Sequence, residues 1–350
     1  MHNLRQLDEA LLVEVCRRFI DKMRPADIAK WLSEEVNDRV NREEIYPLIR
    51  EAIDRGYFSI LPPANELMRQ RIADRYRKGK DKDRIHVVSV TADSAQELLP
   101  SYAAELITSR ISQIAVNKDC VRIGLGGGMT VRQVAKALAA QLRSAEHLPQ
   151  LGFHVLTAGF AVRRPRTAPI TFLGFFAQVP TDIDYVGLFA PAVVDAKDYA
   201  RVRTLPGVKE SFESAEQIDL IVTSLASADD QHGELNEFMT QAGQPTKATL
   251  KALRKAGWVG DLQYHPYSSE APITNVGASV RAMSLFDLEE VRRFAGKENK
   301  HVVVVAGPCG ECGAPKHKAL RPLLENESLK LWTDVVMDMT TAEKLLGEPR

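Results

Sequence analysis

The sequence has few cysteines, no excess of charge of either sign and no long apolar run. Its 350 residues include 4 cysteines, too few for a disulfide framework. Lysine and arginine together number 46, as do aspartate and glutamate, which argues against a histone-like polycation. No apolar stretch approaches the roughly 20 residues that span a bilayer, and the start lacks a basic segment followed by an apolar one. We therefore expect a globular, cytoplasmic protein with no membrane partner.

Residues 1–63 carry the pattern of three short helices followed by a β ribbon. Apolar residues repeat at spacings of three and four within 11–20, 28–32 and 45–53, and residues 57–61 are strand-like. This layout predicts a winged helix-turn-helix whose third helix would read the major groove of DNA. A three-helix module for protein contacts is the alternative.

Local signals mark the ends of these helices. Pro25 suits the first turn of the second helix. Asn41 followed by Glu44 is a capping-box pattern before the third helix, and Gly56 is typical of a helix end.

Residues 64–84 predict the connection between two domains. A helical pattern covers 64–78, and a polar, turn-like stretch covers 79–83. Eight basic and three acidic residues lie between Arg69 and Arg84. This basic stretch suits either a charged partner or a solvated linker face.

Strand and helix patterns alternate over residues 85–350. Apolar strands are predicted at 85–90, 121–124, 154–156, 219–223, 301–305 and 335–337, with a helix at 130–142. This alternation predicts an α/β domain with a mostly parallel, Rossmann-like sheet covered on both faces. Ligands of such sheets bind beyond the carboxyl ends of the strands.

The strongest local motif is the glycine-rich loop Gly124–Thr130, between a predicted strand and a predicted helix. Its glycines allow the backbone to approach a ligand, and the following helix directs its positive dipole end at the same place. The loop therefore predicts a phosphate or other anion site. The alternative is a turn that only packs the helix against the sheet.

Two later motifs add candidate ligands. In Gly257–Asp261, two glycines frame a carboxylate that suits sugar hydroxyl groups. In Ala306–Lys316, the lysine would open the next helix, where its ammonium group would neutralise a phosphate. The same loop contains Cys309 and Cys312. Because a zinc site normally has four ligands, the sequence favours a loop with free thiols over a metal or redox centre.

No nucleophile, base and acid stand together in the sequence. His232 is isolated, and the pair Asp229–Asp230 favours solvent over a metal. We therefore expect no catalytic residues, no resident metal and no cofactor.

Several motifs in this order resemble the SorC family of sugar-binding bacterial transcriptional regulators. The family's glycine loop ends in Gly-x-Thr, as in Gly128–Thr130, and its Gly-x-Val-Gly-Asp motif matches Gly257–Asp261. Its late Ala-Gly-Gly…Lys…Ala-Ile/Leu motif is echoed by Ala306–Leu320, and its closing motif looks like Met337–Leu346. The resemblance covers about residues 11–346 and implies an effector domain of the phosphosugar-isomerase type.

This sequence departs from the family pattern at several places. Met129 stands where Arg is frequent, and Pro308 replaces a glycine. Pro47 lies near the start of the third helix, where it removes a backbone donor.

The resemblance implies a regulator of carbohydrate metabolism that binds operator DNA, takes a phosphorylated sugar as effector and forms a dimer or tetramer. Effector contacts carried over from the motifs are Gly126, Gly127, Gly128, Thr130, Asp261 and Lys316. DNA contacts placed by helix position are Arg39, Arg42, Tyr46, Arg50 and Arg55. Two alternatives stay open: a sugar-phosphate isomerase, and a thiol- or metal-responsive regulator.

Overall fold

The computed structural model describes residues 8–57, 61–145, 147–159, 165–236, 244–274 and 280–347. The chain divides into two compact units, Met1–Ile60 with Ala140–Glu146, and the remaining residues. No helix within the described ranges has both the length and the apolar character required to cross a membrane.

Three helices form the first unit: α1 (Glu9–Ile20), α2 (Pro25–Val36) and α3 (Ile45–Arg55). The predicted apolar stripes form its core, which includes Leu12, Val15, Ile28, Leu32, Ile45 and Leu48. The three predicted end signals are confirmed. Pro25 begins α2, Asn41 and Glu44 form a capping box, and Gly56 ends α3 with φ of 83°. Most of the predicted ribbon, residues 58–60, lies outside the described residues.

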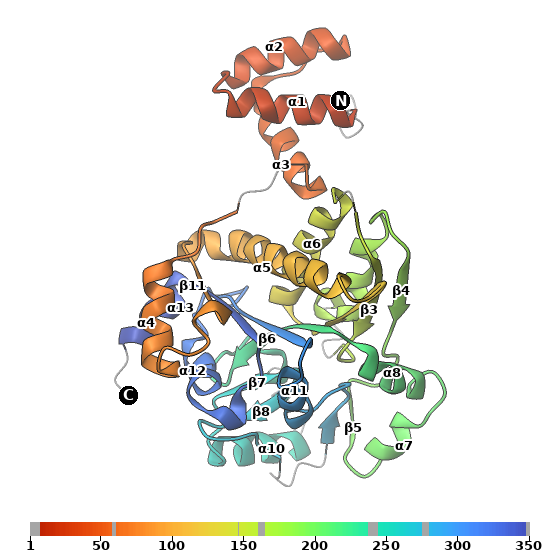
Figure 1. The fold of residues 1–350 in the computed structure, drawn as a ribbon, viewed down its shortest axis with the longest axis vertical. Helices are drawn as coiled ribbons and strands as arrows, with labels where there is room; N and C mark the ends of the chain where they lie inside the picture. Colours follow the sequence, from red (N-terminus) through yellow and green to blue (C-terminus); the bar gives the residue numbers. More distant parts are fainter. Residues whose placement is uncertain are drawn as a thin grey trace. The chain divides into compact units, whose positions relative to one another are not determined.

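The second unit is built on a mostly parallel sheet, as the sequence predicts (Figure 1). In spatial order its path is β1 (Ile85–Val88), β11 (Asp334–Asp338), β10 (His301–Ala306), β6 (Leu220–Ser227), β2 (Cys120–Leu125), β3 (Gln150–Val155) and β4 (Ile183–Val186). Each neighbouring pair along this path is parallel. Two short antiparallel strands, β7 (Gly260–Leu262) and β8 (His265–Tyr267), extend from β6. A separate ribbon pairs β5 (Val193–Asp195) with β9 (Val280–Ala282).

Helices cover both faces of this sheet (Figure 1). The helices described after α3 are α4 (Glu66–Arg77), α5 (Ala92–Ala115), α6 (Met129–Arg143), α7 (Tyr199–Arg203), α8 (Lys209–Ser214), α10 (Gln244–Lys255), α11 (Leu288–Ala295), α12 (His317–Glu325) and α13 (Met339–Gly347). Val302 and Val304 of β10 share one core with Leu320 and Leu323 of α12. The six predicted strands overlap the observed ones, whereas β4, β5, β7, β8 and β9 were not predicted.

Residues of the basic stretch 69–84 attach α4 to other elements of the second unit. Arg75 and Tyr76 donate to backbone carbonyls near the end of α13, at 2.6 and 2.5 Å. Arg77 is buried and bonds Glu327 at 2.8 Å. Two of the eight basic residues in this stretch, Arg75 and Arg77, therefore fix the helix in place.

A buried carboxylate joins the start of β11 to neighbouring elements. Asp334 accepts from Arg110 of α5 at 2.6 Å, and His86 of β1 lies 3.5 Å away. Burial alone would raise the pKa of Asp334, but His86 and Arg110 outweigh it and hold the pKa at about 2. The ionised form is therefore favoured by folding, and this stabilisation is present above about pH 4 and lost as the pH falls toward 2.

We expect Asp334→Asn to lower the free energy of unfolding at pH 7 by about 3 kcal/mol, because it leaves a buried guanidinium without its counter-charge. Denaturant unfolding measures this. The difference in free energy of unfolding between the variant and the wild type should become smaller as the pH falls from 5 toward 3.

The matched control is Asp184→Asn, which removes a carboxylate from a pair with Arg122 in which Asp184 is 48% exposed. Such pairs contribute about 1 kcal/mol or less. Equal losses in the two variants would contradict the structural role assigned to Asp334.

Candidate functional site

A cavity lies beyond the carboxyl ends of β2 and β6, two neighbouring strands from which the chain continues toward opposite edges of the sheet. From β2 the chain continues to β3 on one side, and from β6 it continues to β10 on the other. The loops that leave the carboxyl ends of neighbouring strands separate at such a point and leave room for a ligand. The cavity is open to solvent, and the space between its lining residues, counted together with the solvent at its mouth, is about 770 Å³.

Five of the six predicted effector residues line this cavity: Gly127, Gly128, Thr130, Asp261 and Lys316. They come from the loop after β2, the start of α6, strand β7 and the residue that caps α12. Lys316 opens that helix, as the sequence predicts. The structure therefore brings distant motifs to one place.

The glycine loop offers fewer backbone donors than its sequence indicates. Gly126 donates its N–H to the carbonyl of Val222 at 2.9 Å, and Gly128 donates to the carbonyl of Thr167 at 2.9 Å. Gly126 is also absent from the cavity lining. Among the described residues, no backbone carbonyl accepts a hydrogen bond from the N–H of Gly127, so this donor can face the cavity.

A strained turn places a hydroxyl group beside this loop. Gln263 and Tyr264 join β7 to β8 with φ of 51° and 65°, values that cost side chains other than glycine about 1 kcal/mol each. A Cβ atom at Gly127 would lie 2.5 Å from the Tyr264 hydroxyl oxygen. Glycine is therefore required at position 127 by close approach.

Gln263 was missed by the sequence reasoning and lines the cavity. Its side chain is 5% exposed, and among the described residues neither its amide nitrogen nor its oxygen has a hydrogen-bond partner. Buried amides are rarely left unsatisfied, so this group is suited to a polar ligand. No local sequence signal marks it.

Asp261 and Lys316 are both buried, and burial disfavours the charge of each. Burial raises the pKa of Asp261 to about 8, against the opposing effect of the Lys316 ammonium group. Burial lowers the pKa of Lys316, while Asp230 opposes that shift. At neutral pH Asp261 therefore holds its proton and can donate as well as accept.

The cavity wall carries more acidic than basic groups. Asp230, Glu234, Asp261 and Glu311 line it, against Lys316 and a histidine. One side of the cavity therefore suits a cation or hydroxyl groups better than it suits an anion.

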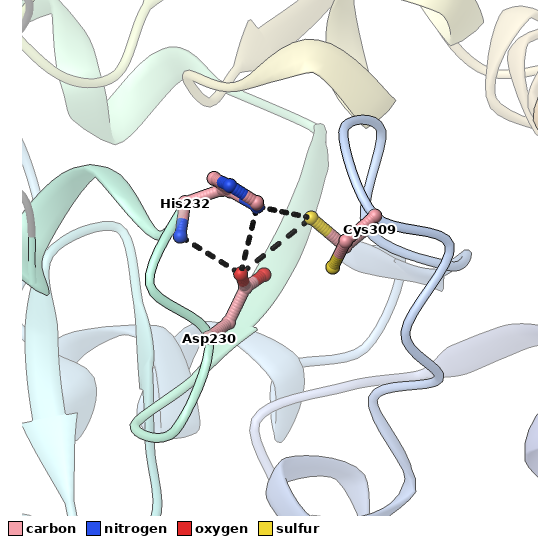
Figure 2. A group of neighbouring side chains, drawn as sticks. Asp230, His232 and Cys309 are labelled. Carbon is pink, nitrogen blue, oxygen red and sulfur yellow. Dashed lines mark hydrogen bonds and ion pairs between the residues drawn. The ribbon is translucent and has the colours of Figure 1, made fainter.

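Asp230, His232 and Cys309 meet at this acidic wall (Figure 2). The first two belong to the loop after β6, and the cysteine belongs to the loop after β10. The sequence analysis placed Asp230 in solvent and treated His232 as isolated. Only the sheet topology, in which β6 and β10 are neighbours, brings these residues together.

The predicted DNA-contacting residues lie on or before α3. Tyr46 is 56% exposed and packs edge-on against Phe19. Arg39 is exposed as well. The other three arginines have acidic neighbours, in the pairs Arg42–Glu43, Arg50–Asp54 and Arg55–Glu51. The first two pairs are largely exposed. Replacing the carboxylate partner of Arg42 or Arg50 by a DNA phosphate would therefore cost little free energy.

Solved structures share this fold at low sequence identity. The full-length sorbitol operon regulator SorC from Klebsiella pneumoniae is 15% identical, over 97% of this chain and 99% of that chain, with a TM-score of 0.62. A DeoR family transcriptional regulator from Listeria monocytogenes is 18% identical over 79% and 99%, with a TM-score of 0.55. A transcriptional regulator from Streptococcus pneumoniae is 15% identical over 81% and 98%, with a TM-score of 0.58.

The sequence comparisons differ in outcome. A search of curated proteins finds no match. The family model described as "Putative sugar-binding domain" matches residues 68–347, which is most of the chain. Both the sugar-binding domain and the SorC-type fold agree with the resemblance that the sequence motifs indicated. The chain belongs to the family of proteins with this sugar-binding domain, and it shares the fold of the sorbitol operon regulator SorC.

Proposed function

We propose that the chain is a DNA-binding transcriptional regulator whose second unit binds a phosphorylated sugar. The observation that carries this proposal is the meeting of Gly127, Thr130, Asp261 and Lys316 in one cavity at the carboxyl ends of the strands. Family membership supports a sugar ligand, and the three N-terminal helices support operator binding. As a regulator the chain would act in the cytoplasm as a dimer or tetramer, which adds affinity through several half-sites.

The phosphate would lie against the start of α6. The Gly127 N–H, the Thr130 hydroxyl and the positive end of the helix dipole would face it, and Lys316 would supply the full positive charge. The sugar hydroxyls would bond Asp261 and the amide of Gln263. Binding would alter DNA affinity only as far as the effector prefers one state of the protein.

A thermal-shift screen against sugar phosphates, free sugars and inorganic phosphate tests the effector site. At a hundredfold excess over its dissociation constant, a ligand stabilises the native state by about 2.7 kcal/mol. We expect one class of sugar phosphate to raise the melting temperature, and the shift to disappear in Thr130→Ala and Lys316→Ala. Gln263→Leu should weaken binding of the sugar phosphate and leave inorganic phosphate unaffected.

The matched control is Lys318→Ala, since Lys318 is 60% exposed and pairs with Asp229. Its shift should equal that of wild type. Binding of free sugars alone would contradict the phosphate assignment, and conversion of a sugar phosphate by the purified protein would favour the isomerase.

Asp261 allows a prediction about pH. Because its pKa is about 8 in the folded protein, the unfolded chain loses the carboxyl proton first. The free energy of unfolding of the ligand-free protein should therefore fall as pH rises from about 4 to 8, by on the order of 1 kcal/mol per pH unit. Asp261→Asn should remove this dependence, stabilise the ligand-free protein at pH 8 and abolish sugar binding. Denaturant unfolding between pH 5 and 8 measures the slope.

Asp195→Asn is the control for this variant, because Asp195 is exposed. Its pH dependence should match that of wild type. If Asp261→Asn keeps the wild-type slope, the carboxyl group is not neutral in the folded state.

The operator-binding proposal centres on Tyr46 and Arg50 of α3. After selection of a preferred site from random DNA, Arg50→Ala should weaken binding by about 1–3 kcal/mol if its guanidinium reads a base edge. Arg42→Ala should weaken specific and non-specific DNA alike and reduce the salt dependence, as expected for a phosphate contact. Tyr46→Ala should weaken binding to the selected site.

Fluorescence anisotropy at two salt concentrations measures these effects. Lys209→Ala, an exposed cation in the second unit, should behave as wild type. If the best selected DNA binds no more tightly than random DNA, operator binding is wrong, whatever the effector screen finds.

A further inference from the structure

Four side chains with metal-binding atoms converge beside the cavity. The ligand atoms of Asp230, His232, Cys309 and Cys312 all lie within 4.8 Å of one another. The Cys309 sulfur is 3.5 Å from Asp230 Oδ1 and 3.8 Å from His232 Nδ1. His232 Nδ1 is 3.8 Å from the same carboxylate oxygen. Figure 2 shows three of these side chains pointing toward one another.

The separations between the ligand atoms of Asp230, His232 and Cys309 match those of ligands around one tetrahedral ion. With bonds of about 2.3 Å to sulfur and about 2.0–2.1 Å to nitrogen or oxygen, ligand atoms on a tetrahedron lie about 3.3–3.8 Å apart. The three measured distances fall between 3.5 and 3.8 Å. Two thiols, an imidazole and a carboxylate also supply the full set of four ligands that the sequence alone did not.

The cysteine loop is folded around its first sulfur. Cys309 N–H donates to the carbonyl of Ala314, and Gly313 N–H donates to the carbonyl of Cys309, both at 2.9 Å. Gly313 has φ of 70°, which glycine adopts without strain. These two backbone hydrogen bonds hold the loop in the turn that brings the Cys309 and Cys312 side chains together.

A backbone hydrogen bond also positions the ligands of the loop after β6. The backbone N–H of His232 donates to Asp230 Oδ1 at 2.9 Å, which fixes the carboxylate beside the imidazole. Two further carboxylates, those of Glu234 and Glu311, line the same cavity as the cluster. A cation bound by the cluster would offset part of that negative charge.

We propose that Asp230, His232, Cys309 and Cys312 bind one zinc ion per chain. Thiolate and imidazole ligands favour zinc over magnesium or calcium, which prefer oxygen. Binding replaces the thiol protons, so one Zn²⁺ enters and up to two protons leave to the solvent. Three of the ligands line the cavity, so the ion would lie at the edge of the proposed effector site.

The test uses the full-length protein, stripped of metal by a chelator and kept reduced, with Co²⁺ as a spectroscopic probe. We expect one Co²⁺ per chain, with thiolate charge-transfer absorption and the d–d bands of a tetrahedral ion, followed by displacement with one equivalent of Zn²⁺. Cys309→Ser with Cys312→Ser should remove the charge-transfer absorption and weaken Zn²⁺ binding by about a hundredfold or more.

His232→Ala distinguishes this site from metal held by the cysteines alone. It should keep thiolate absorption but lose the wild-type d–d spectrum and weaken binding by at least about tenfold. Cys120→Ser is the matched control, because Cys120 begins β2 away from the cluster, and it should behave as wild type. Circular dichroism of each variant establishes that it is folded.

Three results would overturn the proposal: metal binding that is unchanged in the double cysteine variant, an unaltered spectrum in His232→Ala, or no Zn²⁺ bound by reduced wild type. A Cys309–Cys312 disulfide that persists in reducing buffer would do the same. None of these assays contains sugar or DNA, so their failure is separate from failure of the proposed regulator function.

Discussion

The parallel pairing of β2 with β6 is the constraint on which the site depends. The two strands run side by side, but the chain leaves them in opposite directions, so the loops beyond their carboxyl ends separate. At the other end, buried Asp219 holds the same strands together. It accepts from Lys118 at 2.5 Å, from Lys300 at 3.0 Å and from the backbone N–H of Arg122 at 3.1 Å. Hydrogen bonds and ion pairs of Asp219 thus join the strands at one end of the sheet, and the loops at the other end leave room for a ligand.

The open end contains groups that a purely structural role does not explain. Asp261 and Lys316 lie in a buried setting that disfavours the charge of both, and Gln263 is buried without a partner among the described residues. Two left-handed residues hold the β7–β8 turn in place. Each of these features costs stability, and these four residues all line one cavity. Such concentration is expected where a protein keeps polar groups ready for a ligand.

The sequence predicted the parts of the fold that local patterns determine. Strands with continuous apolar runs, such as 301–305, were found, and so were the helix ends marked by Pro25 and Gly56. Strands β7 and β8 have three residues each, too few to show a period of two, so pairing with β6 determines them. The same limit applies to the site. Lys316 was found because it follows a strand and opens a helix, whereas Asp230 meets Cys309 only through the pairing of β6 with β10.

The two proposed ligands of the cavity interact through Asp230. Among the charges that raise the pKa of Lys316, that of Asp230 has the largest effect. Asp230 is also a proposed zinc ligand. When its charge is engaged by a metal ion, less negative charge remains to compete with an anion for the Lys316 ammonium group. Metal and phosphate would then favour each other, and by thermodynamic linkage the coupling is equal in both directions. A cation bound at Asp230 would offset part of the negative charge that the cavity wall presents to a phosphate.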